Sequence, residues 1–491
     1  MDQLRRLSLN SDQPPAWAVR FAPDGQGTRA QQLAAQMRQA ISAAALRPGD
    51  RIPPSRVLAK ALRTSRGTVV TAVEQLSAEG LLETRIGSGT FVAEAAPTVM
   101  PLQAKAPKHW QRPMLEPAPA AVDQPLPGAI DFRPCRPSMA EFPIGPWRRC
   151  LNAALGLAPA SDYGDPRGDP DLRSAICDYL RRARGMSIGR DELMVTNGAV
   201  HAMHLIAQVY LAVPEGEPAP VAVMEDPGYP LARQLFAGAG ARLHYCGIDH
   251  DGLCVSVLPT ATQSLRLAYV SASHQFPTGA RLSRARRQQL LGWAAEHGVL
   301  IIEDDYDGEF CYDVEPLPPL AAMGKGQVAY CGSFSKTLFP DLRLGFVAAH
   351  AEQIELLARY RTRMDYACNG PTQRALARFI ADGHYERHIH RMRRAYARKR
   401  EQVATLVEAS AMPFKLLGSP SGLNALISLP DVAAGTAAAL SARAENAGVL
   451  IPDLSRYQFK SSVEQGLVLG YAALSTEQID LGLERLLSLR L

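Results

Sequence analysis

The sequence predicts a multidomain protein with a small α+β unit at its N-terminus followed by a larger α/β unit, and three observations support this. The chain has 491 residues, too many for one ordinary domain, and its 47% apolar content can fill more than one hydrophobic core. Residues 1–93 hold 12 lysines and arginines against 7 aspartates and glutamates, whereas the rest of the chain is balanced in charge. Residues 94–128 are rich in proline and alanine without apolar periodicity, which is typical of a linker.

Residues 28–93, which follow an N-terminal tail of residues 1–27, predict three helices and a hairpin. Apolar residues recur at helical spacing from 28 to 45, and a second, short helix begins after Ser55 as its N-cap. A third helix begins near Ser65, and the side chains that we expect to face inward from it are Val69, Val70, Val73, Leu76 and Ala78. Strands at 81–84 and 90–92 then flank a glycine-containing turn. This order predicts a winged helix-turn-helix.

The third helix of this unit has the residues of a DNA-binding surface at its start. Hydroxyl groups, a guanidinium group and backbone amides lie together at its positive end, where DNA phosphates and base edges are usually bound. The basic charge of residues 1–93 agrees with double-stranded DNA as the partner. For Thr68 a structural role is as well supported as a DNA contact. The predicted DNA-binding residues are Arg56, Ser65, Arg66, Thr68 and, at the wing tip, Gly87.

The pattern PGDRIPPSRVLAKAL…SRGTVVTAVEQLSAEGLL…GSGTFV resembles the GntR family of bacterial transcription regulators. The match fixes a turn, two helix starts and a wing tip together. Two departures are Pro54, where a small polar residue is common, and Gly67, which removes one base-reading side chain.

The segment 129–491 alternates short buried strands with longer amphipathic helices, which predicts an α/β layered fold. A helical stretch and then a strand-rich stretch predict a smaller C-terminal α/β subdomain at about residues 370–491. The strands expected in the larger part are Leu193–Thr196, Val221–Glu225, Arg242–Cys246, Leu267–Val270, Val299–Glu303, Val328–Cys331 and Gly345–Ala348.

Polar residues that suit a phosphate-bearing aldehyde cofactor follow several of these strands. The segment 197–200 opens a helix whose backbone N–H groups can hold a phosphate, and Tyr229 can stack on a pyridine ring. Asp304 can keep the pyridine nitrogen protonated. Lys336 lies between hydroxyl residues and near Arg343, so its amine can form an imine while its neighbours bind the phosphate. Strand ends at one sheet edge are where such folds bind ligands.

Residues from about 130 to 491 resemble a class I aminotransferase domain of fold type I, the fold of transferases that depend on pyridoxal 5'-phosphate (PLP). Together with the N-terminal unit, the chain resembles the MocR/GabR subfamily of GntR regulators. The resemblance implies PLP as the cofactor, with Lys336 as the Schiff-base lysine and Asp304 as the partner of the pyridine nitrogen. It implies that Tyr306 bonds the ring hydroxyl and that Tyr229 stacks on the ring. The phosphate site implied is Gly198, Ala199, Val200, Ser333, Ser335 and Arg343.

The same resemblance implies a homodimer with shared active sites. Tyr163, in the run Tyr-Gly-Asp-Pro-Arg-Gly, matches the tyrosine that this fold donates to the phosphate site of the partner chain.

Two departures from aminotransferases bear on function. Phe276 replaces the asparagine that contacts the ring hydroxyl, so that bond is expected from Tyr306 or Gln275. Val468 stands where aminotransferases carry the arginine that binds the substrate α-carboxylate. Losing that arginine–carboxylate pair costs an amino-acid substrate roughly 1.5–3 kcal/mol. The sequence therefore favours sensing over turnover.

Three hypotheses remain open from the sequence. In the first, PLP, or PLP with a small amine or amino acid, binds at Lys336 and shifts the dimer between arrangements with different DNA affinity. In the second, the chain is an active aminotransferase with an attached DNA-binding module. In the third, PLP has only a structural role.

The remaining features of the sequence predict no disulfide, metal site or membrane segment. The eight cysteines form no CxxC pair and no metal-binding spacing, and the chain has no signal-peptide pattern and no membrane-spanning apolar run, so we expect a cytoplasmic protein. Taken alone, Asp305 or Asp307 would more often be a solvated helix cap, but their order and spacing with Lys336 favour a place in the site. The basic run 387–400 is expected to be a charged helix face.

Overall fold

The computed structural model describes residues 27–94 and 128–489, apart from residues 159, 214–215, 261–263, 313–316, 325 and 461–463. The chain divides into two units, Met1–Met114 and Leu115–Leu491. The predicted tail (residues 1–27) and linker (residues 94–128) lie almost wholly outside the described residues.

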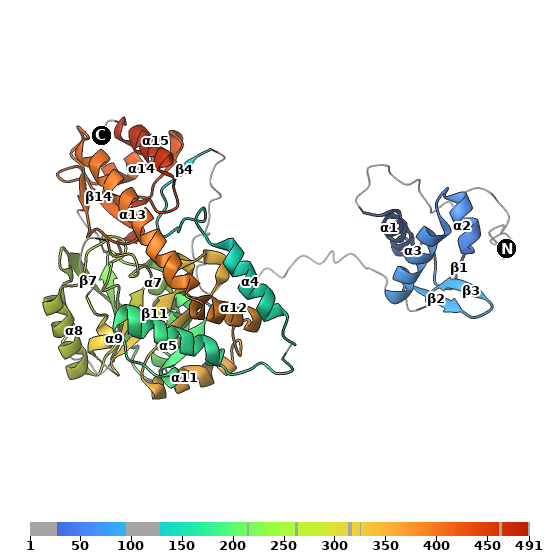
Figure 1. Cartoon of the computed structure of the whole chain (residues 1–491), viewed down its shortest axis with the longest axis horizontal. Helices are drawn as coiled ribbons and strands as arrows, with labels where there is room; N and C mark the ends of the chain where they lie inside the picture. Colours follow the sequence, from blue (N-terminus) through green and yellow to red (C-terminus); the bar gives the residue numbers. More distant parts are fainter. Residues whose placement is uncertain are drawn as a thin grey trace. The chain divides into compact units, whose positions relative to one another are not determined.

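The N-terminal unit has the predicted order of three helices and a hairpin (Figure 1). Thr28 and Gln31 form a capping box that starts the first helix, and Ser65 caps the third. The three short strands pair antiparallel in the order β1-β3-β2. The elements are α1 (Arg29–Ser42), β1 (Arg51–Ile52), α2 (Ser55–Ala61), α3 (Arg66–Ala78), β2 (Leu82–Arg85) and β3 (Gly89–Val92).

Three details of this unit differ from the sequence prediction. Ser55 is not the N-cap of α2: the cap position belongs to Pro54, and the Ser55 hydroxyl accepts a hydrogen bond from Arg66 Nε at 3.3 Å. Ala78 is exposed, and Ala72 takes its place in the core because residues three and four apart share a helix face. Strand β1 has only two residues, too few to produce an alternating pattern.

The second unit is built on an eight-stranded sheet of order β5-β12-β11-β10-β9-β6-β7-β8. All seven predicted strands are present, and the two-residue β8 was not predicted. Most neighbours are parallel, whereas β12 runs antiparallel to β11 and β5, and β8 runs antiparallel to β7. The strands are β5 (Leu193–Thr196), β6 (Val221–Asp226), β7 (Arg242–Asp249), β8 (Gly252–Leu253), β9 (Leu265–Val270), β10 (Leu300–Asp305), β11 (Val328–Ser333) and β12 (Gly345–Ala348).

Both faces of this sheet are buried, because successive side chains along its strands enter different cores. Met224, Tyr269 and Ile302 pack with α6, α7 and α11. Val223 and Ile301 pack on the opposite side with α8 and α9. The helices are α4 (Ile144–Leu155), α5 (Pro170–Arg184), α6 (Ala199–Tyr210), α7 (Pro230–Gly238), α8 (Arg284–His297), α9 (Leu320–Met323), α10 (Phe334–Thr337), α11 (Ala351–Thr362) and α12 (Gly370–Ala381).

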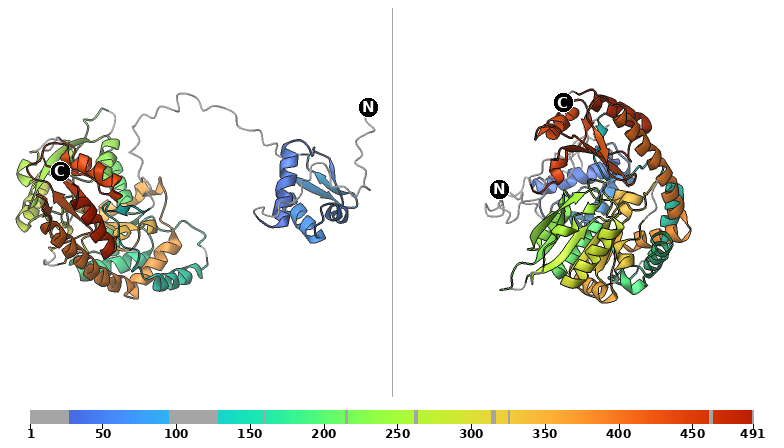
Figure 2. Two further views of the ribbon diagram at one scale, coloured as in Figure 1. Left: turned by 90° about the horizontal axis from the view of Figure 1, so that it is seen from above. Right: turned by 90° about the vertical axis from the view of Figure 1, so that its left-hand side faces the viewer.

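The C-terminal part of this unit contains a second sheet, of order β13-β14-β16, beside long helix α13 (Figure 2). Strand β4, far earlier in the chain, pairs with β15. Within the basic run, Lys399 and Arg400 of α13 are buried, so the run is not simply a charged face. The elements are β4 (Ile130–Asp131), α13 (His384–Glu408), β13 (Lys415–Leu417), β14 (Asn424–Ser428), α14 (Thr436–Asn446), β15 (Val449–Leu450), β16 (Gly466–Gly470) and α15 (Thr476–Leu487).

The topology brings the predicted site segments to one edge of the large sheet. The parallel strands β6, β9, β10 and β11 end there, and the antiparallel β12 begins there. None of the helices in the described ranges combines the length and apolar composition needed to cross a membrane.

Candidate functional site

A cavity of about 130 Å³ lies at this sheet edge and gathers most of the predicted cofactor residues. It also includes Cys135, Met203, Tyr269 and Phe276, which were not predicted as cofactor contacts. The predicted residues that line it are Ala199, Val200, Tyr229, Asp304, Tyr306, Ser333, Ser335, Lys336 and Arg343. Residues that lie as far apart in the sequence as positions 135 and 343 therefore line one cavity.

Lys336 reaches the cavity from the short helix α10, which directly follows β11. Ser333 caps this helix by accepting a hydrogen bond from the backbone N–H of Ser335 at 3.2 Å. Phe334 and Thr337 are buried, which anchors α10. The segment is thus a helical turn whose buried faces fix the position of Lys336.

Ser335 and Arg343 line one part of the cavity, and Gly198, which does not line it, lies beside Arg343. Gly198 has a φ of +86°, and a Cβ there would lie 3.4 Å from Arg343 Nη2, so a glycine lets the guanidinium approach the start of α6. Arg343 Nη2 donates to the carbonyl of Asn197 at 3.0 Å. The buried Ser335 hydroxyl has no hydrogen-bond partner among the described residues. A helix N-terminus, a guanidinium and a free hydroxyl fit a phosphate group.

Asp304 provides the carboxylate of the site, which suits the ring nitrogen of the cofactor and not its phosphate. Its Oδ2 accepts a hydrogen bond from Tyr269 at 2.7 Å, whereas its Oδ1 has no partner in the described chain. Burial raises the pKa of Asp304 to about 7. An unpaired carboxylate oxygen in a buried place fits the protonated ring nitrogen of PLP.

Aromatic side chains form the walls of the cavity. Tyr229 and Phe276 meet edge to face with ring centroids 6.0 Å apart, and Phe276 makes a similar contact with Tyr306 at 6.1 Å. Burial raises the pKa of Tyr306 well above the usual value of a phenol, so this side chain remains a hydrogen-bond donor.

The structure does not support a cofactor contact for Gln275. Its amide donates to the carbonyls of Pro227 at 2.8 Å and Phe276 at 2.6 Å, and its Oε1 accepts from Thr278 Oγ1 at 2.6 Å. The side chain is 1% exposed and is not among those that line the cavity. Gln275 therefore holds its own turn, and Tyr306 is left as the donor expected at the ring hydroxyl.

Val468 lies in an apolar environment. It is fully buried in β16 and packs with Leu426, Leu454 and Tyr457. Among the cavity-lining residues of the described chain, Arg343 is the only arginine, and it lies at the phosphate end. The position that resembles the carboxylate-binding site of aminotransferases is therefore hydrophobic.

Cys135 lines the cavity, although nothing in the sequence predicted it as a site residue. Its backbone N–H donates to Asn424 Oδ1 at 3.1 Å, and its thiol lies 3.6 Å from the same oxygen. Its φ of +63° is unusual for a residue with a side chain. Neither property leaves a local pattern in the sequence.

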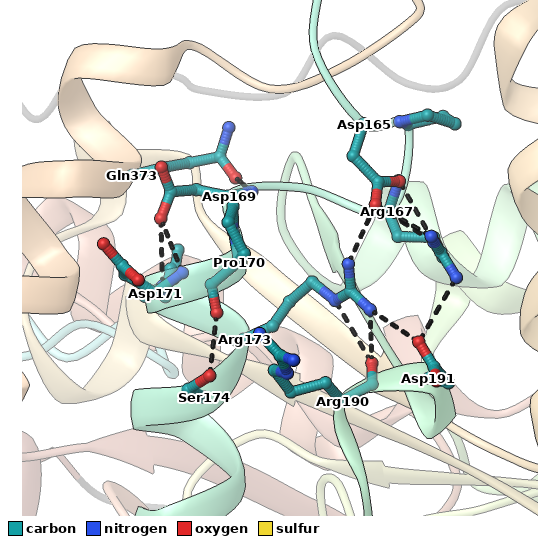
Figure 3. A network of polar contacts seen from close by, with 12 residues as sticks. Asp165, Arg167, Asp169, Pro170, Asp171, Arg173, Ser174, Arg190, Asp191 and Gln373 are labelled. Carbon is teal, nitrogen blue, oxygen red and sulfur yellow. Dashed lines mark hydrogen bonds and ion pairs between the residues drawn. The ribbon is translucent and has the colours of Figure 1, made fainter.

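Tyr163 does not line the cavity of its own chain. Its side chain is 73% exposed and stacks on Tyr366 with ring centroids 4.5 Å apart. The loop after it is held by Asp165, which accepts hydrogen bonds from Arg167 and Arg173 at 3.0 Å (Figure 3). An exposed tyrosine thus projects from an anchored loop.

In the N-terminal unit the predicted DNA-binding residues lie around the start of α3. The Ser65 hydroxyl caps the helix by accepting from the Thr68 N–H at 3.1 Å, and it lies 2.9 Å from the Thr68 hydroxyl. These contacts favour the structural role for Thr68. Arg56 and Arg66 are exposed, and Gly87, with a φ of +76°, forms an open tip.

The buried carboxyl groups of the large unit predict a pH-dependent stability without cofactor. Asp304 has a pKa raised to about 7 by burial, above the 3.8 of an exposed aspartate, so the folded protein retains a proton that the unfolded chain releases. The stabilising contribution is complete below about pH 4 and is lost as the pH rises through about 7. Urea unfolding of cofactor-free protein is expected to show this decline, and Asp304→Asn to make it shallower. An equal slope in Asp304→Asn and in the surface control Asp178→Asn would contradict the assignment.

Two family models match the chain. "Bacterial regulatory proteins, gntR family" matches residues 29–92, and "Aminotransferase class I and II" matches residues 152–486. The probable rhizopine catabolism regulatory protein MocR of Rhizobium meliloti is 33% identical over 93% of this chain and 92% of its own length. The pyridoxine biosynthesis transcriptional regulator PdxR of Corynebacterium glutamicum is 31% identical over 90% and 91%.

The fold of the large unit agrees with these matches. The kynurenine aminotransferase of Pyrococcus horikoshii, solved in complex with PMP, superposes with a TM-score of 0.67 and 26% identity, over 73% of this chain and 90% of that one. When bound, PLP supplies an aldehyde that reacts with amines and a ring that withdraws electrons. The chain belongs to the MocR-type regulators of the GntR family, in which a DNA-binding helix-turn-helix domain is joined to a PLP-binding domain of aminotransferase class I and II.

Proposed function

We propose that this regulator is a homodimer that binds promoter DNA in the cytoplasm and responds at Lys336 to PLP, or to PLP with a small amine or amino acid. The observation that carries the proposal is a cavity lined by most of the predicted cofactor residues in a chain whose Val468 lies in apolar surroundings. We assign the DNA-binding domain to residues 28–93 and the sensing domain to residues 129–491, with a small subdomain at about 370–491.

Several cavity residues have distinct roles in this proposal. Lys336 holds the cofactor covalently, and Arg343, Ser335 and the start of α6 bind its phosphate. Asp304 accepts the ring nitrogen proton and Tyr229 covers the ring. The partnerless oxygens of Asp304 and Ser335 support these roles, because buried polar atoms are rarely left unpaired.

Sensing is favoured over turnover by the apolar surroundings of Val468. A buried valine cannot replace the bidentate bond that an arginine makes to a substrate carboxylate. An amino acid would therefore bind weakly, and it would lack the orientation that catalysis requires. The relative named for pyridoxine biosynthesis supports a vitamin B6 compound as the effector.

The dimer in this proposal rests on Tyr163. The tyrosine is mostly exposed on an anchored loop, and it would complete the phosphate site of the partner chain. Because each cofactor would then contact both chains, its binding would favour one dimer arrangement over another. A difference in cofactor affinity between the two arrangements is what regulation requires.

Footprinting on the upstream region of the protein's own gene tests the proposal. Wild type and Lys336→Ala are compared with and without PLP. The wild-type footprint is expected to change with PLP, and the variant footprint to stay the same. Identical footprints in all four conditions would refute sensing.

The alternative of an active aminotransferase is supported by the intact Lys336 and Asp304 in a fold shared with aminotransferases. It predicts steady transfer of an amino group from a donor to a keto acid at ordinary enzyme rates. Such turnover by the full chain would overturn the sensing proposal.

Arg66→Ala is expected to weaken specific DNA binding about tenfold or more, because a base or phosphate contact contributes about 1–3 kcal/mol. Gel-shift titrations at several salt concentrations provide the measurement. Loss of a phosphate contact should also reduce the salt slope by about one. Arg29→Ala, an exposed arginine of α1, is the matched control. If both variants bind DNA with the same affinity, Arg66 is not part of the DNA-binding surface.

A further inference from the structure

A second layer of polar side chains lies behind Tyr306, outside the cavity. His274 Nδ1 is 3.0 Å from the Tyr306 hydroxyl and 3.0 and 3.2 Å from the two carboxylate oxygens of Asp307. The backbone N–H of Leu423 also donates to Asp307, at 3.1 Å. His274 and Asp307 are 3% and 1% exposed, so Asp307 is buried and is not a solvated helix cap.

Two glycines from different segments enclose this pair. A Cβ on Gly422, whose φ is +74°, would lie 2.2 Å from His274 Nδ1 and 2.5 Å from Asp307 Oδ2. A Cβ on Gly279, whose φ is +73°, would lie 3.2 Å from His274 Nε2. A side chain at Gly422 would overlap the His274 ring, and one at Gly279 would press against it, so both glycines leave room for the ring in this position.

The position of the His274 proton follows from these contacts. Nδ1 lies within 3.2 Å of both oxygens of Asp307, and since an ionised carboxylate only accepts hydrogen bonds, the pairing with Asp307 assigns the proton to Nδ1. A proton on Nε2 instead would leave a buried N–H without an acceptor, because Nε2 has no partner among the described residues. With Nδ1 protonated, the Tyr306 oxygen can only accept from His274. The Tyr306 hydroxyl proton is then directed elsewhere.

We propose that His274, held by Asp307, is a positioning residue that directs the Tyr306 hydroxyl proton into the cavity, toward the ring oxygen of the cofactor. The inference rests on the cofactor contact proposed for Tyr306. It also accounts for Phe276: with no amide at that position and Gln275 used in its own turn, Tyr306 is the donor that must be oriented. The missing contact from position 276 to the ring oxygen is thus compensated, because His274 fixes the contact that Tyr306 makes.

The test measures the pH midpoint of the absorbance change of the bound cofactor, which follows the proton shared by the ring oxygen and the lysine nitrogen. A donor at the ring oxygen favours the deprotonated form, in which that oxygen carries more negative charge. Tyr306→Phe is expected to raise the midpoint by about one pH unit, a tenfold change in proton affinity. His274→Asn is expected to raise it in the same direction, with His244→Asn, a partly exposed histidine of β7, as the control.

The double variant His274→Asn/Tyr306→Phe distinguishes positioning from a separate effect. If His274 acts through Tyr306, the double variant has the midpoint of Tyr306→Phe alone. An additional shift in the double variant, or an unchanged midpoint in His274→Asn, overturns the inference. Asp304, Lys336 and Cys135, the other titratable groups facing this cluster, are the same in all variants.

Two controls complete the design. If His274→Asn does not fold, Asp307→Asn replaces it, because it removes the acceptor that fixes the His274 proton, and the same outcomes apply. Lys336→Ala reports separately on the proposed function. Cofactor absorbance that is unaffected by Lys336→Ala would refute the cofactor site itself, whereas a normal wild-type spectrum with no response to His274→Asn refutes only the positioning role.

Discussion

Replacing Lys336 with alanine is expected to abolish covalent retention of PLP. Lys336 is the only lysine among the described residues that line the cavity, so no other amine there can replace it. After reduction with borohydride, mass spectrometry of wild-type peptides should find the cofactor on the peptide that contains Lys336. The variant should carry no reduced cofactor.

The expected loss also extends to regulation. Without the covalent bond, PLP should no longer change DNA binding by the variant, although DNA binding itself should persist because the winged helix is a separate unit. Lys460→Ala, which removes an exposed lysine whose ammonium donates to the Tyr245 carbonyl, is the control and should behave as wild type. Reduced cofactor on a peptide other than that of Lys336 would place the site elsewhere.

Replacing Arg184 with methionine is expected to destabilise the large unit by about 3–5 kcal/mol, because it leaves a buried carboxylate without its counter-charge. Arg184 pairs with Asp305, and it also donates to the carbonyl of Gly308 at 2.8 Å and to Ser273 Oγ at 3.2 Å. The side chains of Arg184 and Asp305 are 5% and 2% exposed. The pair supports the end of β10, where Asp304 lies. Urea unfolding measured in the cofactor-free protein gives the change.

Two further variants show whether the lost charge pair is the cause. Arg181→Met breaks the surface pair with Asp178 and should cost less than about 1 kcal/mol. Arg184→Met combined with Asp305→Asn should recover part of the stability, because the unpaired charge is then removed. A double variant less stable than Arg184→Met alone would show that packing, not charge, dominates.

Some parts of the site could be predicted because they are local. Lys336, Asp304 and Arg343 each stand at the end or beginning of a strand whose apolar run is visible in the sequence, and parallel strands bring such ends to one edge. The start of α3 was likewise predictable, since Ser65 caps a helix through residues three positions away.

Other parts depended on contacts between distant segments. Gln275 was a candidate cofactor contact on sequence grounds, but the tertiary structure pairs its amide with Phe276 and Thr278 of its own turn and with Glu225 and Pro227 at the end of β6. Asp305 and Asp307 are paired with groups from other elements, Asp305 with Arg184 and Tyr330 and Asp307 with His274 and Leu423. No periodic pattern in either segment records such a pairing.

The sequence by itself determined the order of the two units, the strands of the large sheet and the winged helix, because short-range periodicity and capping specify them, and it predicted Lys336 as the candidate cofactor lysine. Only the tertiary structure decided which polar groups are left free for a ligand and which are used internally. Cys135 and Asn424 are 289 positions apart and yet share a hydrogen bond, and His274 is oriented by Asp307 from another strand end. The physical reason is that burial and pairing of polar side chains are set by segments that meet only when the sheet and the small subdomain have packed.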